Sequence, residues 1–192
     1  MRIVGGSHRG RHLFAPPGDA VRPTSDRARE ALFNILSHGS LAGDGGSFVG
    51  TVLDAFAGTG ALGLETLSRG AAEAVFIEQD RDALSILRRN IDALGESARV
   101  RIVQGDATRP PRAVVQCATV FLDPPYRSGL AVTALEALDA AGWFAPQALA
   151  VVELAAREEL LPPRGFTLLD ERVYGAARLV FLRCAGNTED AR

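Results

Sequence analysis

The sequence predicts an α/β fold with one mostly parallel sheet and helices on both of its faces. From residue 51 onward, short apolar runs typical of buried strands alternate with longer stretches that have helical periodicity. A glycine-rich turn, Gly58-Thr59-Gly60, joins the first such strand to the first such helix. Strands that alternate with helices are connected by crossovers, which place them parallel in one sheet. A length of 192 residues suits one domain of this kind with a short extension.

The helix that precedes this alternation is predicted from its cap and its apolar stripe. Thr24 or Ser25 can cap its start, and Asp26 in the first turn suits the helix dipole. The helix ends near Ser37, where a glycine-rich loop begins. The apolar residues at helical spacing are Ala28, Ala31, Leu32, Ile35 and Leu36.

The elements that follow are separated by glycines, prolines and polar clusters. Five strands are predicted at residues 51–55, 74–78, 100–103, 119–123 and 149–154. Three helices are predicted at residues 61–69, 81–94 and 129–141. Residues 166–174 and 178–183 predict a closing hairpin around Gly175. The chain is therefore expected to comprise an N-terminal extension with a helix (1–50), a sheet domain (51–184) and a disordered tail (185–192).

Charge is distributed unevenly along the chain. Residues 1–36 carry six arginines and three acidic residues, whereas the remainder carries 15 arginines and 20 acidic residues. A basic segment at one end is typical of a nucleic-acid contact. All of these fixed cations are arginines, which grip phosphate with two hydrogen bonds and stack on bases. The extension is thus predicted to bind nucleic acid.

The sequence has no feature of a secreted or membrane protein. No run of about 18 uncharged apolar residues exists, and the charged segment from Met1 to Arg11 lacks the apolar core of a signal peptide. The two cysteines, Cys117 and Cys184, form no CxxC pair. We expect a cytoplasmic protein with two reduced thiols and no metal ion.

The turn after the first strand has the spacing of a nucleotide-binding loop. Gly58, Gly60 and Gly63 let the backbone turn tightly and let a ligand approach closely. Asp54 ends the strand before this loop. Its carboxylate would repel a pyrophosphate at the helix N-terminus, but it suits a sulfonium or ammonium group. This favours S-adenosylmethionine over NAD as the cofactor.

Acidic residues also follow the next two strands. Glu78, 18 residues after Gly60, can accept hydrogen bonds from ribose hydroxyls, as it also would in an NAD site. Asp106 follows the third strand and can accept a hydrogen bond from an adenine amino group, or it simply closes an Asp turn. The predicted cofactor-binding residues are Asp54, Phe56, Ala57, Gly58, Gly60, Glu78, Gln79, Asp106, Ala107 and Asp123.

The segment Asp123-Pro124-Pro125-Tyr126 at the end of the fourth strand is the predicted catalytic loop. Its two prolines stiffen the backbone and remove two donors. The Asp123 carboxylate and the Pro124 carbonyl can accept both hydrogens of an exocyclic amine, whose lone pair is otherwise delocalised into the base. Tyr126 can stack on a base that has swung out of its helix or loop. Positioning of the amine would contribute most of the rate.

These residues resemble the (D/N)PP(F/Y/W) amino-methyltransferases, and the chain from residue 1 to about 183 is similar to the RsmD family within them. The matching segments are Met1-Arg2-Ile3-Val4-Gly5-Gly6, Arg9-Gly10-Arg11, Arg22-Pro23-Thr24-Ser25-Asp26-Arg27-Ala28-Arg29-Glu30, the glycine loop and the Asp-Pro-Pro-Tyr loop. The chain departs from the family at Ser7-His8, where members often have Lys and Trp, and at Ala176-Ala177, where members often have Asp-Thr.

The resemblance implies the strand order 3-2-1-4-5-7-6, with the seventh strand antiparallel, of a Rossmann-like class I methyltransferase. It implies methyl transfer from S-adenosylmethionine to the N2 amine of a guanine in bacterial 16S ribosomal RNA, with S-adenosylhomocysteine as the other product. The substrate would be the small ribosomal subunit or an assembly intermediate of it, and the enzyme would be a monomer. The RNA-binding residues would be Arg2, Arg9, Arg11, Arg22 and Arg27.

Three alternatives remain open from the residues themselves. A DNA adenine-N6 methyltransferase would share the Asp-Pro-Pro-Tyr loop, but residues 1–50 leave little room for a target-recognition region. An NAD-linked oxidoreductase would use the glycine loop and leave Asp54 unexplained. A non-catalytic RNA-binding assembly factor would not need Asp123.

Overall fold

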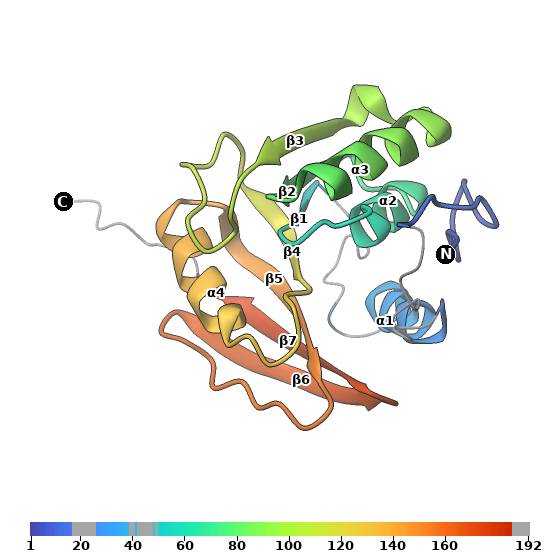
Figure 1. Ribbon diagram of the computed structural model, residues 1–192. Coiled ribbons are helices and arrows are strands. Elements are labelled where there is room, and N and C mark those ends of the chain that lie inside the picture. The colour runs from blue at the N-terminus through green and yellow to red at the C-terminus, as the bar shows by residue number, and fades with distance from the viewer. Residues whose placement is uncertain (17–25, 39–40, 42–47, 49, 186–192) are drawn as a thin grey trace.

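The computed structural model describes residues 1–16, 26–38, 41, 48 and 50–185. Within them, one seven-stranded sheet has the order β3-β2-β1-β4-β5-β7-β6 (Figure 1). The strands are β1 (Thr51–Asp54), β2 (Glu73–Glu78), β3 (Val100–Gln104), β4 (Cys117–Leu122), β5 (Phe144–Ala155), β6 (Phe166–Tyr174) and β7 (Ala177–Cys184). The helices are α1 (Asp26–His38), α2 (Ala61–Ser68), α3 (Arg81–Leu94) and α4 (Leu130–Ala140), with a 3-10 turn η2 (Ser97–Arg99).

The strand directions confirm the predicted, mostly parallel sheet. Strands β1 to β5 pair in parallel, as crossover helices require. Strand β7 runs antiparallel to both β5 and β6, because β6 and β7 form the predicted hairpin around Gly175. The strand order is also the one that the family resemblance implied.

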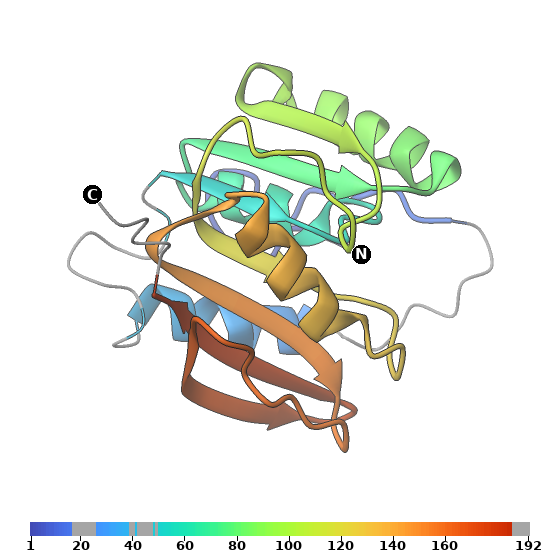
Figure 2. The ribbon, with the colours of Figure 1, turned by 90° about the vertical axis from the view of Figure 1, so that its left-hand side faces the viewer.

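Helices cover both faces of the sheet, and each face has its own hydrophobic cluster. On the first face, α1, α2 and α3 contribute buried side chains such as Phe33, Leu64 and Leu87. On the second face, α4 packs Leu135 and Leu138 against the sheet. Figure 2 shows α4 in front of the sheet and α1 behind it. Alternate residues of the central strands thus lie in different clusters, which explains their nearly continuous apolar runs.

Strand β5 begins earlier than its apolar run predicts. The run starts at Leu149, but the strand starts at Phe144, which pairs with Cys117 of β4. The register then shifts between Cys117 and Thr119, and Gln147 has a φ angle of 60°. This irregularity breaks the alternation of apolar residues that marks a strand in sequence.

The N-terminal arm, defined as residues 1–14, folds back on itself and packs onto the domain. Arg2 and His12 form an antiparallel bridge, and Leu13 N donates to Met1 O at 3.1 Å. Ile3 and Leu13 are buried in the hydrophobic cluster of the first face. The arm therefore shares the core of the sheet domain.

Some sequence expectations fall outside the described residues. The caps Thr24 and Ser25, the residue Arg22 and the tail from residue 186 onward belong to this group. In the part of the chain that the structure describes, no helix is both long enough and apolar enough to cross a membrane.

Candidate active site

Four parallel strands deliver the predicted site residues to one edge of the sheet. The carboxyl ends of β1, β2, β3 and β4 meet there, as in other open α/β sheets that bind ligands. Backbone hydrogen bonds join the loops that follow the strands. Ala55 N donates to Phe121 O at 2.9 Å, and Gly105 N donates to Glu78 O at 3.0 Å. The site loops are therefore fixed to one another directly beyond the strands.

The glycine loop adopts a left-handed conformation that favours glycine. The φ angle is 53° at Gly58 and 83° at Gly60. A Cβ on Gly60 would lie 2.3 Å from Leu87 Cδ1, whereas a Cβ on Gly58 would meet nothing within 4 Å. Packing of the loop against α3 therefore requires glycine at 60. At Gly58 the backbone borders open space, where a ligand can approach.

Glu78 holds the glycine loop in place, a role that its spacing did not predict. Its Oε2 accepts a hydrogen bond from Gly58 N at 2.7 Å, and its Oε1 accepts one from Asp80 N at 2.8 Å. Asp80 in turn caps the N-terminus of α3. Each carboxylate oxygen has a second lone pair, so the predicted contact with ribose hydroxyls remains compatible with these bonds.

Asp54 is a buried carboxyl with an unsatisfied oxygen. Its Oδ2 accepts a hydrogen bond from Gly63 N at 3.0 Å, while its buried Oδ1 has no hydrogen-bond partner among the described residues. Burial raises the pKa of Asp54 to about 7, the Gly63 N–H opposes this rise, and the nearby Glu78 carboxylate adds to it. A positive group beside Oδ1 would satisfy this oxygen, so the residues fit a cationic ligand.

The other predicted cofactor residues surround the same edge. Asp106 Oδ1 accepts hydrogen bonds from Thr108 N at 2.8 Å and from Thr108 Oγ1 at 2.7 Å, which is the Asp turn left open above. Ala57 and Ala107 are buried in opposite clusters, Phe56 packs on the second cluster, and Gln79 is exposed. A contact of any of them with a cofactor stays a prediction.

The Asp-Pro-Pro-Tyr loop follows β4, next to β1. Asp123 is half-buried, Pro124 is buried and Pro125 is exposed. Tyr126 is half-buried and leans toward β5, where its phenol donates to Glu153 Oε1 at 2.7 Å. The loop thus lies at the predicted edge, between the end of β1 and the end of β5.

A surface pocket of about 820 Å³ adjoins this loop. It is lined by Tyr126, Arg127, Gly129, Ala155, Ala156, Arg157, Glu158 and Ala176. Of these residues, only Tyr126 was predicted from the sequence to be functional, because the others come from three separate segments of the chain. Glu153 was not predicted either, although a lone acid inside an apolar strand is an unusual feature.

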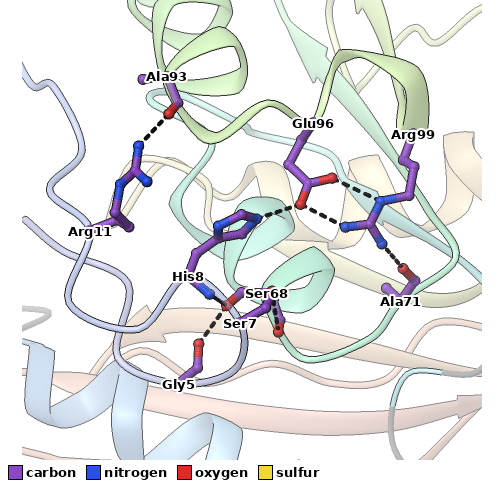
Figure 3. Close-up of polar contacts among 9 residues, drawn as sticks. All are labelled: Gly5, Ser7, His8, Arg11, Ser68, Ala71, Ala93, Glu96 and Arg99. Carbon is purple, nitrogen blue, oxygen red and sulfur yellow. Dashed lines mark hydrogen bonds and ion pairs between the residues drawn. The ribbon is translucent and has the colours of Figure 1, made fainter.

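The predicted RNA-binding arginines of the arm are not equivalent. Arg2 and Arg9 are exposed. The carbonyl of Arg2 accepts a hydrogen bond from Arg29 Nη2 at 2.8 Å, which ties the arm to α1. Arg11 donates through Nη2 to Ala93 O at 2.6 Å, near the C-terminus of α3 (Figure 3). The side chain of Arg27 is not among the side chains that the structure describes.

The tip of the arm is held on α2 and beside η2 by polar contacts (Figure 3). His8 Nε2 lies 2.5 Å from Glu96 Oε1, and Arg99 Nη2 donates to the same oxygen at 2.6 Å. Ser68 Oγ donates to Gly5 O at 2.6 Å. The hydrogen bond of His8 therefore helps to hold the tip of the arm against the domain.

No group of three or more His, Cys, Asp or Glu side chains in the described residues has an arrangement that could hold a metal ion. Both cysteines are buried, and Cys184 Sγ lies 3.5 Å from Asp139 Oδ1. Burial raises the pKa of the Cys117 thiol to about 12.

The sequence is similar to a known protein family and to named bacterial proteins. The family model described as "Conserved hypothetical protein 95" matches residues 1–183. The ribosomal RNA small subunit methyltransferase D of Escherichia coli is 39% identical over 198 residues, which cover 100% of this chain and 94% of that protein. The protein of the same name from Haemophilus influenzae is 37% identical and covers 91% of this chain and 89% of its own length.

Solved structures show the same fold. The structure of yhhF from Escherichia coli superposes with a TM-score of 0.82 at 36% identity, covering 97% of this chain and 99% of that one. The rRNA methyltransferase aviRa from Streptomyces viridochromogenes, at 18% identity and a TM-score of 0.65, shares the fold alone. The sheet is therefore the Rossmann-like sheet of class I methyltransferases, and the chain belongs to the "Conserved hypothetical protein 95" family, which is the RsmD family that its sequence motifs resemble.

Proposed function

We propose that this protein transfers the methyl group of S-adenosylmethionine to the exocyclic N2 amine of a guanine in bacterial 16S ribosomal RNA. The observation that carries the proposal is the placement of the Asp123-Pro124 turn at the sheet edge that also holds the glycine loop and Asp54. Relatives at 37–39% identity are named ribosomal RNA small subunit methyltransferases, which supports the RNA substrate.

Asp54, the glycine loop, Glu78 and Asp106 would hold the cofactor. The unsatisfied Oδ1 of Asp54 suits the positive charge of S-adenosylmethionine, and the open space at Gly58 leaves room for its approach. When bound, the cofactor supplies a methyl group on a positively charged sulfur and leaves as S-adenosylhomocysteine. In this proposal the pKa of Asp54 falls when the cation is beside it, because an opposite charge favours the ionised carboxylate.

The catalytic loop would position the amine. The Asp123 carboxylate and the Pro124 carbonyl accept its two N–H bonds, which localises the nitrogen lone pair and turns it toward the methyl carbon. The amine gains one N–C bond and loses one proton, which can pass to water after transfer. Positioning and hydrogen bonding of this kind need no covalent intermediate on the protein.

The pocket beside the loop would receive the target nucleotide. Its volume of about 820 Å³ lies within the range of about 300–1,000 Å³ usual for ligand sites. Tyr126 offers an aromatic wall, three alanines offer an apolar one, and Arg127 and Arg157 suit phosphate groups. A nucleotide that has swung out of an RNA loop matches this combination of surfaces.

The experiment that tests the proposal uses purified protein, labelled S-adenosylmethionine and small ribosomal subunits from a strain that lacks this methyltransferase. We expect label in the 16S RNA, with S-adenosylhomocysteine formed in equal amount. Label in adenine of added DNA would instead support the DNA methyltransferase alternative. Binding of subunits without any transfer would support the assembly-factor alternative and would contradict the proposal.

A further inference from the structure

Glu153 is a buried acid that the proposed reaction does not use. It belongs to β5, and its side chain is 4% exposed. Strands β4 and β5 pair in parallel with Leu122 opposite Val152, so Glu153 follows on β5 where Asp123 follows on β4. A buried carboxylate is costly unless hydrogen bonds compensate it. Its position beside the catalytic loop therefore calls for a role there.

Glu153 contacts the catalytic loop through Tyr126, whose phenol donates a hydrogen bond to Glu153 Oε1 at 2.7 Å. Hydrogen bonds to a charged acceptor are the stronger ones in proteins. The prolines before Tyr126 fix the backbone but not the torsions of the aromatic side chain. Beyond Tyr126 the chain turns through Arg127, whose φ angle is 58°, before α4 begins.

We propose that Glu153 is a positioning residue that fixes the ring of Tyr126 as a wall of the nucleotide pocket. Strand β5 lies between β4 and β7, so the acceptor sits on a rigid element, while the ring belongs to a loop (Figure 1). A ring that is already fixed presents one face to the pocket. No further conformational entropy is then lost in ordering this side chain when a base stacks on it. At 4% exposure Glu153 acts through Tyr126 and not on the base. This inference rests on the proposed function.

The first test measures the contact itself and needs no activity. The chain has two tyrosines, Tyr126 and Tyr174, so protein labelled with 3-fluorotyrosine gives two ¹⁹F resonances, which a Tyr174→Phe variant assigns. We expect the Tyr126 resonance to shift in Glu153→Ala and to stay in place in Glu73→Gln, a control at a partly exposed surface pair. An unchanged Tyr126 resonance in Glu153→Ala would overturn the inference.

The second test is a double-mutant cycle in the methyl-transfer assay. Tyr126→Phe and Glu153→Ala should each lower kcat/KM for the RNA about tenfold, since each removes the same hydrogen bond that orders the ring before a base stacks on it. The double variant should be no slower than Glu153→Ala. Glu153→Gln keeps an acceptor oxygen and should recover most of the rate.

The outcomes separate the inference from the proposed function. Losses that multiply in the double variant would overturn the positioning role, as would a Tyr126→Phe variant with unchanged kcat/KM. Tyr126→Phe keeps the ring and its packing, so a folding defect in Glu153→Ala would not hide the result. If the wild-type protein transferred no methyl group, the proposed function would fail, while the ¹⁹F resonances would still decide whether Glu153 holds the ring.

Discussion

Asn90 of α3 donates through Nδ2 to the carbonyl of Thr59, in the middle of the glycine loop, at 2.8 Å. The same fully buried side chain joins the N-terminal arm at Phe14. Phe14 N donates to Asn90 Oδ1 at 2.7 Å, and Asn90 Nδ2 donates to Phe14 O at 3.1 Å. One amide therefore links the arm to the loop that would hold the cofactor.

Replacing Asn90 with Ala should loosen both segments. The change leaves Phe14 N, Phe14 O and Thr59 O without this partner, so we expect a loss of about 2–4 kcal/mol in the free energy of unfolding. Hydrogen exchange at the Phe14 amide should accelerate. Asp92→Asn, at an exposed position of the same helix, is the control and should change neither quantity. Slow exchange at Phe14 in the Asn90 variant would contradict this account of the arm.

The glycines offer a matched set of variants. Gly58, Gly60 and Gly70 all have positive φ angles, but only Gly60 lacks space for a Cβ, which would meet Leu87. Ala at 58 should cost about 1 kcal/mol through backbone strain. Ala at 70 should cost more because its φ angle of 106° lies outside the left-handed helical region, and Ala at 60 should cost more because its Cβ would meet Leu87. Urea unfolding measures these costs.

Cofactor affinity then separates Gly58 from Gly70. Both variants strain the backbone, but only a Cβ at 58 projects into the space proposed for the ligand. Calorimetric titration with S-adenosylmethionine should show weaker binding for Gly58→Ala and unchanged binding for Gly70→Ala. Equal affinities would place the ligand elsewhere.

Asp54 should make stability depend on pH. Its pKa is about 7 in the folded protein, compared with 3.8 for an ordinary aspartate, so folding favours the protonated form. The stability that protonated Asp54 contributes is fully present below pH 3.8 and is lost as the pH rises through the folded-state pKa of about 7. Asp54→Asn mimics the protonated form. Its free energy of unfolding should exceed that of the wild type increasingly from pH 5 to pH 8, approaching roughly 4 kcal/mol at most.

The same variant should bind S-adenosylmethionine poorly above pH 7, where wild-type Asp54 is ionised. Wild-type affinity should rise with pH up to that point, whereas the affinity of Asp54→Asn should not.

The stability comparison has its own contradicting result. A difference in the free energy of unfolding between Asp54→Asn and the wild type that does not change with pH would show that Asp54 is not the titrating group.

Glu96 should contribute to the free energy of unfolding with the opposite pH dependence to Asp54, because its contribution is lost as the pH falls. Burial alone would raise the pKa of Glu96, but hydrogen bonds from Arg99 and His8 outweigh it and lower the pKa below 4.5. Its contribution is thus present above that value and lost as the pH falls through the folded pKa. Glu96→Gln should cost about 1 kcal/mol at pH 7, because water screens the half-exposed Arg99, and this cost should shrink as the pH falls below 4.5.

The control for this variant is Glu73→Gln. Glu73 pairs with Arg101 at 3.7 Å at a partly exposed surface position, so its loss should leave the unfolding free energy nearly unchanged. An equal effect of both substitutions at pH 7 would mean that the contacts of the arm tip at Glu96 add no stability.

Most of the fold could be predicted because it depends on local patterns. The alternation of strands and helices, the helix over residues 81–94 and the hairpin around Gly175 are all visible in the residues. The start of β5 could not be predicted, because the bulge near Gln147 interrupts the apolar pattern. The packing of the arm on α2 and α3 depends on contacts about 60 residues apart or more, which a local pattern does not report.

Candidate site residues could be chosen from the sequence where one residue type at a strand end implies a chemistry. Asp54, Glu78 and Asp123 are such residues, and the structure brings their strands together at one edge. The structural roles of Glu78 and Asn90 toward the glycine loop were not predictable, since they depend on the positions of side chains in three dimensions. Glu153 shows the same limit, because its partner Tyr126 lies 27 residues away.

The most direct test of the central claim is the methylation state of 16S RNA in cells. Mass spectrometric mapping would compare a strain that lacks the gene with the same strain carrying either the wild-type gene or Asp123→Ala. We expect one N2-methylguanosine to be missing in the first strain, restored by the wild type and not by Asp123→Ala, although this variant remains folded. An unchanged set of methylated guanines in the strain without the gene would contradict the account, as would full restoration by Asp123→Ala.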